Sequence, residues 1–108
     1  MSDIQIELAG ETYDLECKLG AFKSISERFG GFVGAFRKLA EVDIDAIAFI
    51  IAAGAGKPRN SKETEKITER LFEEGLEETL PKLTEYLSLL SAGGVKRKEA
   101  QSEAEGER

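Results

Sequence analysis

The sequence predicts an α+β fold, mainly α, in which an N-terminal β-hairpin packs on a bundle of about five short helices. Residues 4–8 and 13–18 alternate apolar and polar side chains, as half-buried strands do. Residues 20–91 change to a helical period that glycines interrupt. A chain of 108 residues with 41% hydrophobic content has room for a single core. We therefore expect one compact domain over residues 1–92 and a disordered tail over residues 93–108.

Two short runs, residues 4–8 and 13–18, form the predicted hairpin. The four residues 9–12 between them have the length of a hairpin turn. Because an isolated hairpin is marginal in water, its apolar face must lie against the helices that follow. The side chains expected on that face are Ile4, Ile6, Leu8, Tyr13, Leu15 and Cys17, so Cys17 is expected to be a buried thiol.

Two short helices are predicted over residues 20–29 and 32–40, separated by Gly30-Gly31. Paired glycines lose much backbone entropy in a helix and readily adopt positive φ, so they favour a tight corner. Four of the six phenylalanines lie between Phe22 and Phe36. We expect this aromatic cluster to lie where the hairpin, both short helices and the next helix meet.

The next helix, within residues 43–56, is apolar on nearly every side, which is typical of a helix surrounded by other elements. Asp43 is a suitable N-cap, and Gly54 and Gly56 offer two ways to end the helix. A membrane span needs about 20 apolar residues, so this run is too short and we expect no membrane insertion.

A charged helix is predicted after the loop at residues 54–60, with Asn60 or Ser61 as its N-cap. Its expected apolar stripe consists of Ile67, Leu71 and Phe72. On its charged side we expect Lys66 to pair with Glu69 and Arg70 to pair with Glu74. Gly75 is expected to separate this helix from the last one.

The last helix carries leucines in alternating steps of four and three, a heptad-like stripe of Leu76, Leu80, Leu83, Leu87 and Leu90. Pro81 is tolerated if the helix begins near Thr79. Tyr86 and Leu89 make the apolar surface wider than one packing face requires. We therefore predict a partner-binding surface formed by Tyr86, Leu87, Leu89 and Leu90.

The composition excludes several classes of function. A formal net charge of −6 and a pI near 4.8 argue against nucleic acid, whose binding depends on Lys and Arg. The chain has no His and one Cys, so the usual acid-base residues, zinc ligand sets and an intramolecular disulfide are missing. No signal or transit peptide is recognised at its start, so we expect a cytoplasmic protein. We also expect no cofactor.

Two local motifs are similar to known binding or catalytic sites, but neither predicts such a site here. Gly54-Ala-Gly-Lys57 is similar to a phosphate-binding loop, but Ile51 stands where the first glycine belongs and Pro58 where a Ser or Thr belongs. Glu73, Glu74, Glu77 and Glu78 are close in sequence, but they lack EF-hand spacing and an apolar surrounding that would raise a carboxyl pKa. We predict no catalytic, metal or cofactor site, and acid-base catalysis by these glutamates stays the enzymatic alternative.

The order of elements adds a resemblance. The chain runs from a hairpin, IQIELAGETYDLECK, through the corner LGAFKSISERFGG to the apolar DIDAIAFIIAAGAG, then a charged helix and a leucine-rich one. Over residues 4–91 this arrangement resembles the small tail-assembly chaperones of long-tailed bacteriophages, in particular the group shared with gene transfer agents and related prophages. The resemblance implies a non-enzymatic protein, present in the cytoplasm of a bacterial host, that binds and shields the helical tape measure protein during tail morphogenesis.

An alternative function follows from the same leucine stripe. A structural tail component, in the tube or as a minor tail protein, would use that stripe to oligomerise in the virion. Under both hypotheses the expected partners are the tape measure protein, other tail proteins or further copies of this chain.

Overall fold

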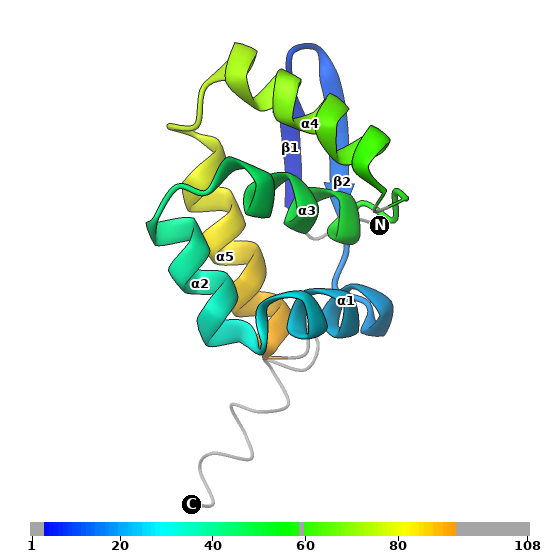
Figure 1. Cartoon of the computed structure of the whole chain (residues 1–108), viewed down its shortest axis with the longest axis vertical. Helices are drawn as coiled ribbons and strands as arrows, with labels where there is room; N and C mark the ends of the chain where they lie inside the picture. Colours follow the sequence, from blue (N-terminus) through cyan, green and yellow to red (C-terminus); the bar gives the residue numbers. More distant parts are fainter. Residues whose placement is uncertain (1–3, 59, 93–108) are drawn as a thin grey trace, which may run out of the picture.

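The computed structural model of the protein describes residues 4–58 and 60–92. Over these residues the fold is α+β and mainly α, with one antiparallel hairpin and five helices in the predicted order (Figure 1). The elements are β1 (Ile4–Leu8), β2 (Glu11–Leu15), α1 (Leu19–Phe29), α2 (Phe32–Ala40), α3 (Ile44–Gly54), α4 (Ser61–Glu74) and α5 (Thr79–Ser91). The predicted disordered tail, residues 93–108, lies outside the described part.

The hairpin is tighter than the sequence pattern indicated. Leu8 pairs with Glu11, so the turn consists of two residues, Ala9 and Gly10, and β2 begins at Glu11 instead of Tyr13. Ala9 and Gly10 have φ of 50° and 87°, and positive φ at both central positions gives a turn whose twist matches that of the paired strands. Cys17 lies beyond the end of β2 and is half-buried against the core, so this thiol is less buried than predicted.

The corner between α1 and α2 is made by the predicted glycine pair. Gly30 has φ of 68° and Gly31 has φ of 114°, conformations that L side chains rarely adopt. A third glycine, Gly34 in α2, lies against the end of α1, where an added Cβ would overlap the carbonyl oxygen of Phe29. The two helices therefore cross at a distance that only glycine permits at position 34.

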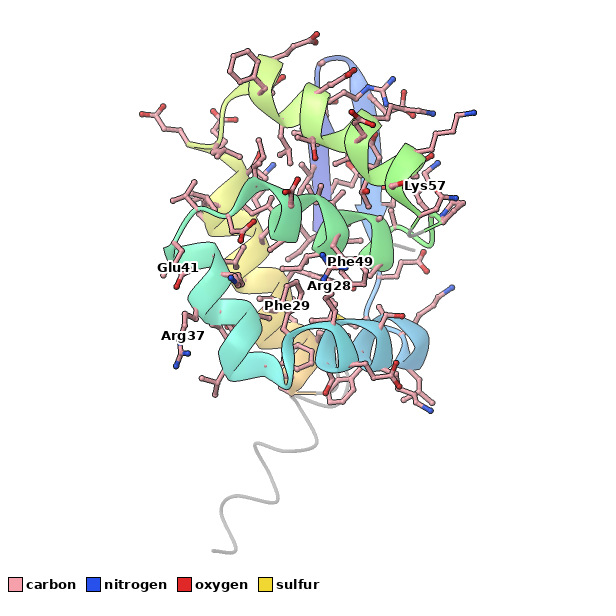
Figure 2. All side chains as sticks on the ribbon, viewed as in Figure 1. Arg28, Phe29, Arg37, Glu41, Phe49 and Lys57 are labelled. Atoms are coloured by element: carbon pink, nitrogen blue, oxygen red, sulfur yellow. The ribbon has the colours of Figure 1, made fainter. Side chains whose placement is uncertain are left out.

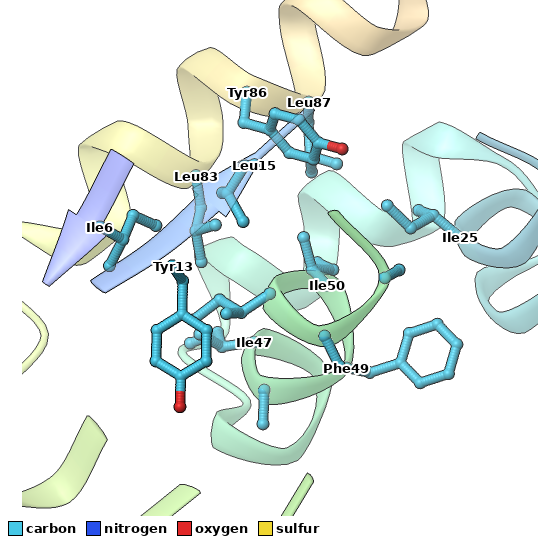
Figure 3. Close-up of a cluster of buried hydrophobic side chains, with 14 of the residues drawn as sticks. Ile6, Tyr13, Leu15, Ile25, Ile47, Phe49, Ile50, Leu83, Tyr86 and Leu87 are labelled. Atoms are coloured by element: carbon cyan, nitrogen blue, oxygen red, sulfur yellow. The ribbon is translucent and has the colours of Figure 1, made fainter. Parts of the chain in front are cut away.

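The helix α3 is the centre of the core. The Asp43 carboxylate caps it by accepting a hydrogen bond of 3.1 Å from the backbone N–H of Ala46. Every residue from Ala46 to Gly54 is buried. Side chains from both strands and from α1 and α5 surround α3 (Figure 3). The all-round apolar pattern of this segment is explained by neighbours on all of its sides.

The helix α4 covers α3 and the hairpin with one face. Asn60 caps it, accepting a hydrogen bond of 2.8 Å from the backbone N–H of Glu63. Ile67 and Leu71 are buried as predicted, whereas Phe72 is 83% exposed. Position 72 is about 100° further round the helix than position 71, beyond the edge of the face that the hairpin covers.

The predicted ion pairs of α4 are also replaced by other contacts. Arg70 donates a hydrogen bond of 3.0 Å to the hydroxyl of Tyr13 on β2, and the Glu74 carboxylate accepts one of 3.0 Å from the backbone N–H of Ala9. Arg70 and Glu74 therefore form hydrogen bonds between α4 and the hairpin instead of pairing with each other. Lys66 lies 3.7 Å from the carboxylate of Glu63, one turn earlier, instead of pairing with Glu69.

The helix α5 begins at Thr79, so Pro81 lies in the first turn, where its missing N–H removes no helical hydrogen bond. Gly75, with φ of 89°, ends α4 as predicted. In the heptad-like stripe, Leu83, Leu87 and Leu90 are buried and Leu76 and Leu80 are half-buried. Among the described helices, none combines the length and the apolar character that a membrane span requires.

Candidate functional site

The structure removes most of the predicted partner surface on α5. Tyr86 and Leu87 are 0% exposed and Leu90 is 2% exposed, because α2, α3 and β1 pack around this helix. All three belong to the core: Tyr86 and Leu87 offer no surface to a partner, and Leu90 contributes only a small edge to a neighbouring hollow. Leu89 is half-buried, so it is the one member of the predicted set that keeps appreciable accessible area.

Exposed apolar side chains lie instead in the first turn of α1 and in the first turn of α2. Leu19 at the start of α1 is 73% exposed, Phe22 one turn later is 36% exposed, and Val33 in the first turn of α2 is 75% exposed. Phe32, half-buried beside Val33, stacks on Phe22 with a distance of 4.9 Å between ring centroids and an interplanar angle of 31°. We call this surface, formed by Leu19, Phe22, Phe32 and Val33, the apolar end.

A shallow hollow opens beside the apolar end, with a volume of about 140 Å³. It is lined by Cys17, Lys18, Leu19, Phe22 and Leu90. Three segments that are distant in the sequence therefore meet here: the link from β2 to α1, the first turn of α1 and the last turn of α5. Recesses of this kind receive single apolar side chains in many protein interfaces.

The helices of the apolar end are basic. Residues 19–40 contain four Lys or Arg and one Glu, although the whole chain carries a net charge of −6. Lys18, at the rim of the hollow, has its Nζ 2.8 Å from a carboxylate oxygen of Glu16, and this hydrogen bond raises the pKa of Lys18.

The aromatic cluster does not lie where it was expected. The hairpin packs on α3, α4 and α5, so phenylalanines of α1 and α2 stay half-buried or exposed. Phe29 meets Phe49 of α3 edge to face, with ring centroids 5.8 Å apart. The guanidinium of Arg28 lies 4.8 Å from the centroid of the Phe49 ring, on the outer side of that contact (Figure 2). This arrangement holds α1 on α3 and leaves Phe22 and Phe32 to the apolar end.

The glutamates near the turn between α4 and α5 form no metal centre. Glu74 is engaged by the backbone N–H of Ala9, and Glu73, Glu77 and Glu78 are exposed. Over residues 4–58 and 60–92, no three His, Cys, Asp or Glu side chains are grouped so that they could hold a metal ion. The loop at residues 54–58 ends α3, with the backbone N–H of Lys57 bonded to the carbonyl of Ala52 at 2.9 Å.

The apolar end was missed in the sequence because its residues look like ordinary helix positions. The predicted helix begins at Gly20, after Leu19, and Phe22 belongs to the aromatic cluster that is predicted in the core. One sequence feature indicates this exposed surface: α1 and α2 contain more large apolar residues than short helices can bury on one face. Comparisons of the chain with protein-family models, with curated proteins and with solved structures find no match.

Proposed function

We propose that this protein is a non-enzymatic assembly chaperone that binds an exposed apolar helix of a partner through its apolar end. In the setting suggested by the order of its elements, the partner is the tape measure protein of a long-tailed phage or prophage, and the complex forms in the host cytoplasm. The observation that supports the proposal is the exposure of Leu19, Phe22 and Val33 on two adjoining helices.

The chemistry of the surface describes the partner segment. An amphipathic helix can place one apolar side chain in the hollow of about 140 Å³ and lay its neighbours, one turn apart, on Phe22 and Val33. Because α1 and α2 are basic, acidic residues should flank the apolar stripe of that helix. The net charge of −6 would help to keep such a complex soluble.

The test is co-expression of the full chain with the tape measure protein from the same phage or prophage, followed by pull-down and a solubility comparison. We expect a soluble complex with the wild-type chain. Leu19→Glu and Val33→Glu should each lower recovery of the partner by roughly tenfold or more, because each puts a charge into the apolar contact.

The matched control is Val42→Glu, since Val42 is 46% exposed but lies between α2 and α3, outside the apolar end. This variant should bind like the wild type. Equal binding by all three variants would place the contact elsewhere and overturn the proposed surface. Leu89→Glu tests whether the accessible part of α5 extends that surface.

The structural alternative is separated by a second measurement. A chaperone is absent from purified tails, whereas a tube or minor tail component is present there in many copies. Quantitative mass spectrometry of purified particles counts the chain directly. Many copies per particle would replace the chaperone with a structural component that uses the same apolar end.

A further inference from the structure

We propose that the protein also associates with itself head to tail, with Phe72 of one copy seated in the hollow at the apolar end of the next. Phe72 is the most exposed large apolar side chain of the described residues, at 83%. The hollow is lined by Cys17, Lys18, Leu19, Phe22 and Leu90 and has a volume of about 140 Å³. One molecule thus carries both a protruding aromatic ring and an apolar recess.

The surroundings of the two surfaces are opposite in charge. Phe72 lies on α4 between the exposed carboxylates of Glu69 and Glu73. Residues 61–78 contain seven Glu against three Lys or Arg, whereas residues 19–40 contain four Lys or Arg against one Glu. Docking α4 of one copy onto α1 of another therefore brings the most acidic segment of the fold to a helix with a net charge of +1. Lys38 of α2 is already paired with Glu41 and Asp43. The same chemistry that selects an acidic, apolar helix as a partner fits this helix of a second copy.

The two surfaces cannot satisfy each other within one molecule. The helix α4 lies at one end of the fold and α1 with the first turn of α2 lies at the other, and α3 separates them (Figure 1). A contact between two different surfaces on two copies is heterologous, so a pair of bound copies presents a free Phe72 at one end and a free hollow at the other. Such a contact produces rings or open chains, in contrast to the closed dimer of a two-fold interface.

The test uses the full chain alone and two variants that each destroy one half of the contact. Phe72→Glu removes the protruding ring, and Leu19→Glu places a carboxylate at the rim of the hollow. Both positions are largely exposed, so both variants should fold, which circular dichroism and urea unfolding verify. Sedimentation velocity over a concentration series, at low and high salt, measures the association.

We expect the wild-type chain to form species larger than a dimer as its concentration rises, and high salt to weaken them. Each variant alone should associate at least roughly tenfold more weakly. An equal mixture of the two variants should form a one-to-one dimer and nothing larger, because Leu19→Glu still offers Phe72 and Phe72→Glu still offers the hollow. Val42→Glu, outside both surfaces, should assemble like the wild type.

Three results would overturn the inference. They are a wild-type chain that stays monomeric at the highest concentration reached, variants that associate as strongly as the wild type, and a mixture of the two variants that stays monomeric. The last result would indicate a two-fold interface that needs both surfaces on each copy. None of these measurements involves a partner protein, so the proposed chaperone function can fail or succeed independently.

Discussion

The hydroxyl of Tyr86 on α5 donates a hydrogen bond of 2.6 Å to the backbone carbonyl of Glu16, seventy residues earlier. Tyr86 is completely buried, and its hydroxyl would be 2.9 Å from a Cβ added at Gly54. One side chain therefore connects the end of the hairpin, the last turn of α3 and α5. Tyr86, which the sequence predicts on a partner-binding surface of the last helix, makes its contacts inside the folded protein.

Removing this hydroxyl should destabilise the fold. In Tyr86→Phe the ring remains, but the Glu16 carbonyl keeps only the backbone N–H of Lys18 as a donor, at 3.1 Å, so we expect the free energy of unfolding to fall by about 1 kcal/mol. Urea unfolding followed by circular dichroism measures it. Ser88→Ala, on the exposed side of the same helix, should change it by less than about 0.5 kcal/mol. Equal effects of the two substitutions would show that the hydroxyl makes no special contribution.

Two glycine-to-alanine substitutions should act in opposite directions. At Gly34 the new Cβ would overlap the carbonyl oxygen of Phe29, which must force α1 and α2 apart and cost about 2 kcal/mol or more. At Gly20, in the first turn of α1, an added Cβ meets no atom within 4 Å, and alanine should stabilise the helix by up to about 1 kcal/mol. Thermal unfolding of both variants tests this, and a stabilising Gly34→Ala would contradict the close packing of the two helices.

The N-cap of the central helix should contribute to the pH dependence of stability. The hydrogen bond from the Ala46 N–H, and next the Lys38 ammonium 3.5 Å away, lower the pKa of Asp43 from its ordinary value of 3.8. Because the pKa of Asp43 is lower in the folded state than in the unfolded state, its carboxylate stabilises the fold fully at pH values above the unfolded pKa. This stabilisation is lost as the pH falls through the folded pKa.

The matched variant is Asp43→Asn, which keeps a good N-cap but has no proton to bind. We expect the wild type to lose stability relative to this variant as the pH falls from about 5 to about 2.5, measured by urea unfolding at each pH. A difference between the two proteins that is constant over this range would show that Asp43 does not titrate differently in the folded and unfolded states.

The contact between Arg28 and Phe49 should add measurable stability. Arg28→Gln removes a guanidinium 4.8 Å from the ring centroid, and the loss expected at an exposed site is about 0.5–1 kcal/mol. Arg37→Gln, on the exposed side of α2, removes the same charge without that ring and should change stability less (Figure 2). If both variants lose the same amount, the effect comes from net charge and not from stacking.

The fold class, the order of the elements and most helix ends were predictable from the sequence. Asp43, Asn60, Gly30-Gly31 and Gly75 act within a few residues of the helix ends that they define, so local spacing is enough to find them. The hairpin was recognised but its turn was placed too broadly. Alternation predicts which side chains share a face, but it does not tell how many residues the turn contains.

The candidate surface was not predictable in this way, and the reason is physical. Periodicity states that one face of a helix is apolar, but the exposure of a residue depends on neighbours from distant parts of the chain. α5 is surrounded by α2, α3 and β1, so Tyr86, Leu87 and Leu90 are buried. Leu19 and Val33 lie on α1 and α2 at positions that no other element covers, so they stay in solvent.

The sequence by itself determined a small acidic α+β protein with a central apolar helix, because its period, caps and glycines are local properties. Only the tertiary structure decided which apolar residues stay exposed, because that depends on contacts such as the one between Tyr86 and Glu16 across seventy residues. The tertiary structure also decided that the exposed Phe72 and the apolar end lie on opposite sides of α3. The reason is that α4, which carries Phe72, packs on one side of α3, and α1 packs on the other.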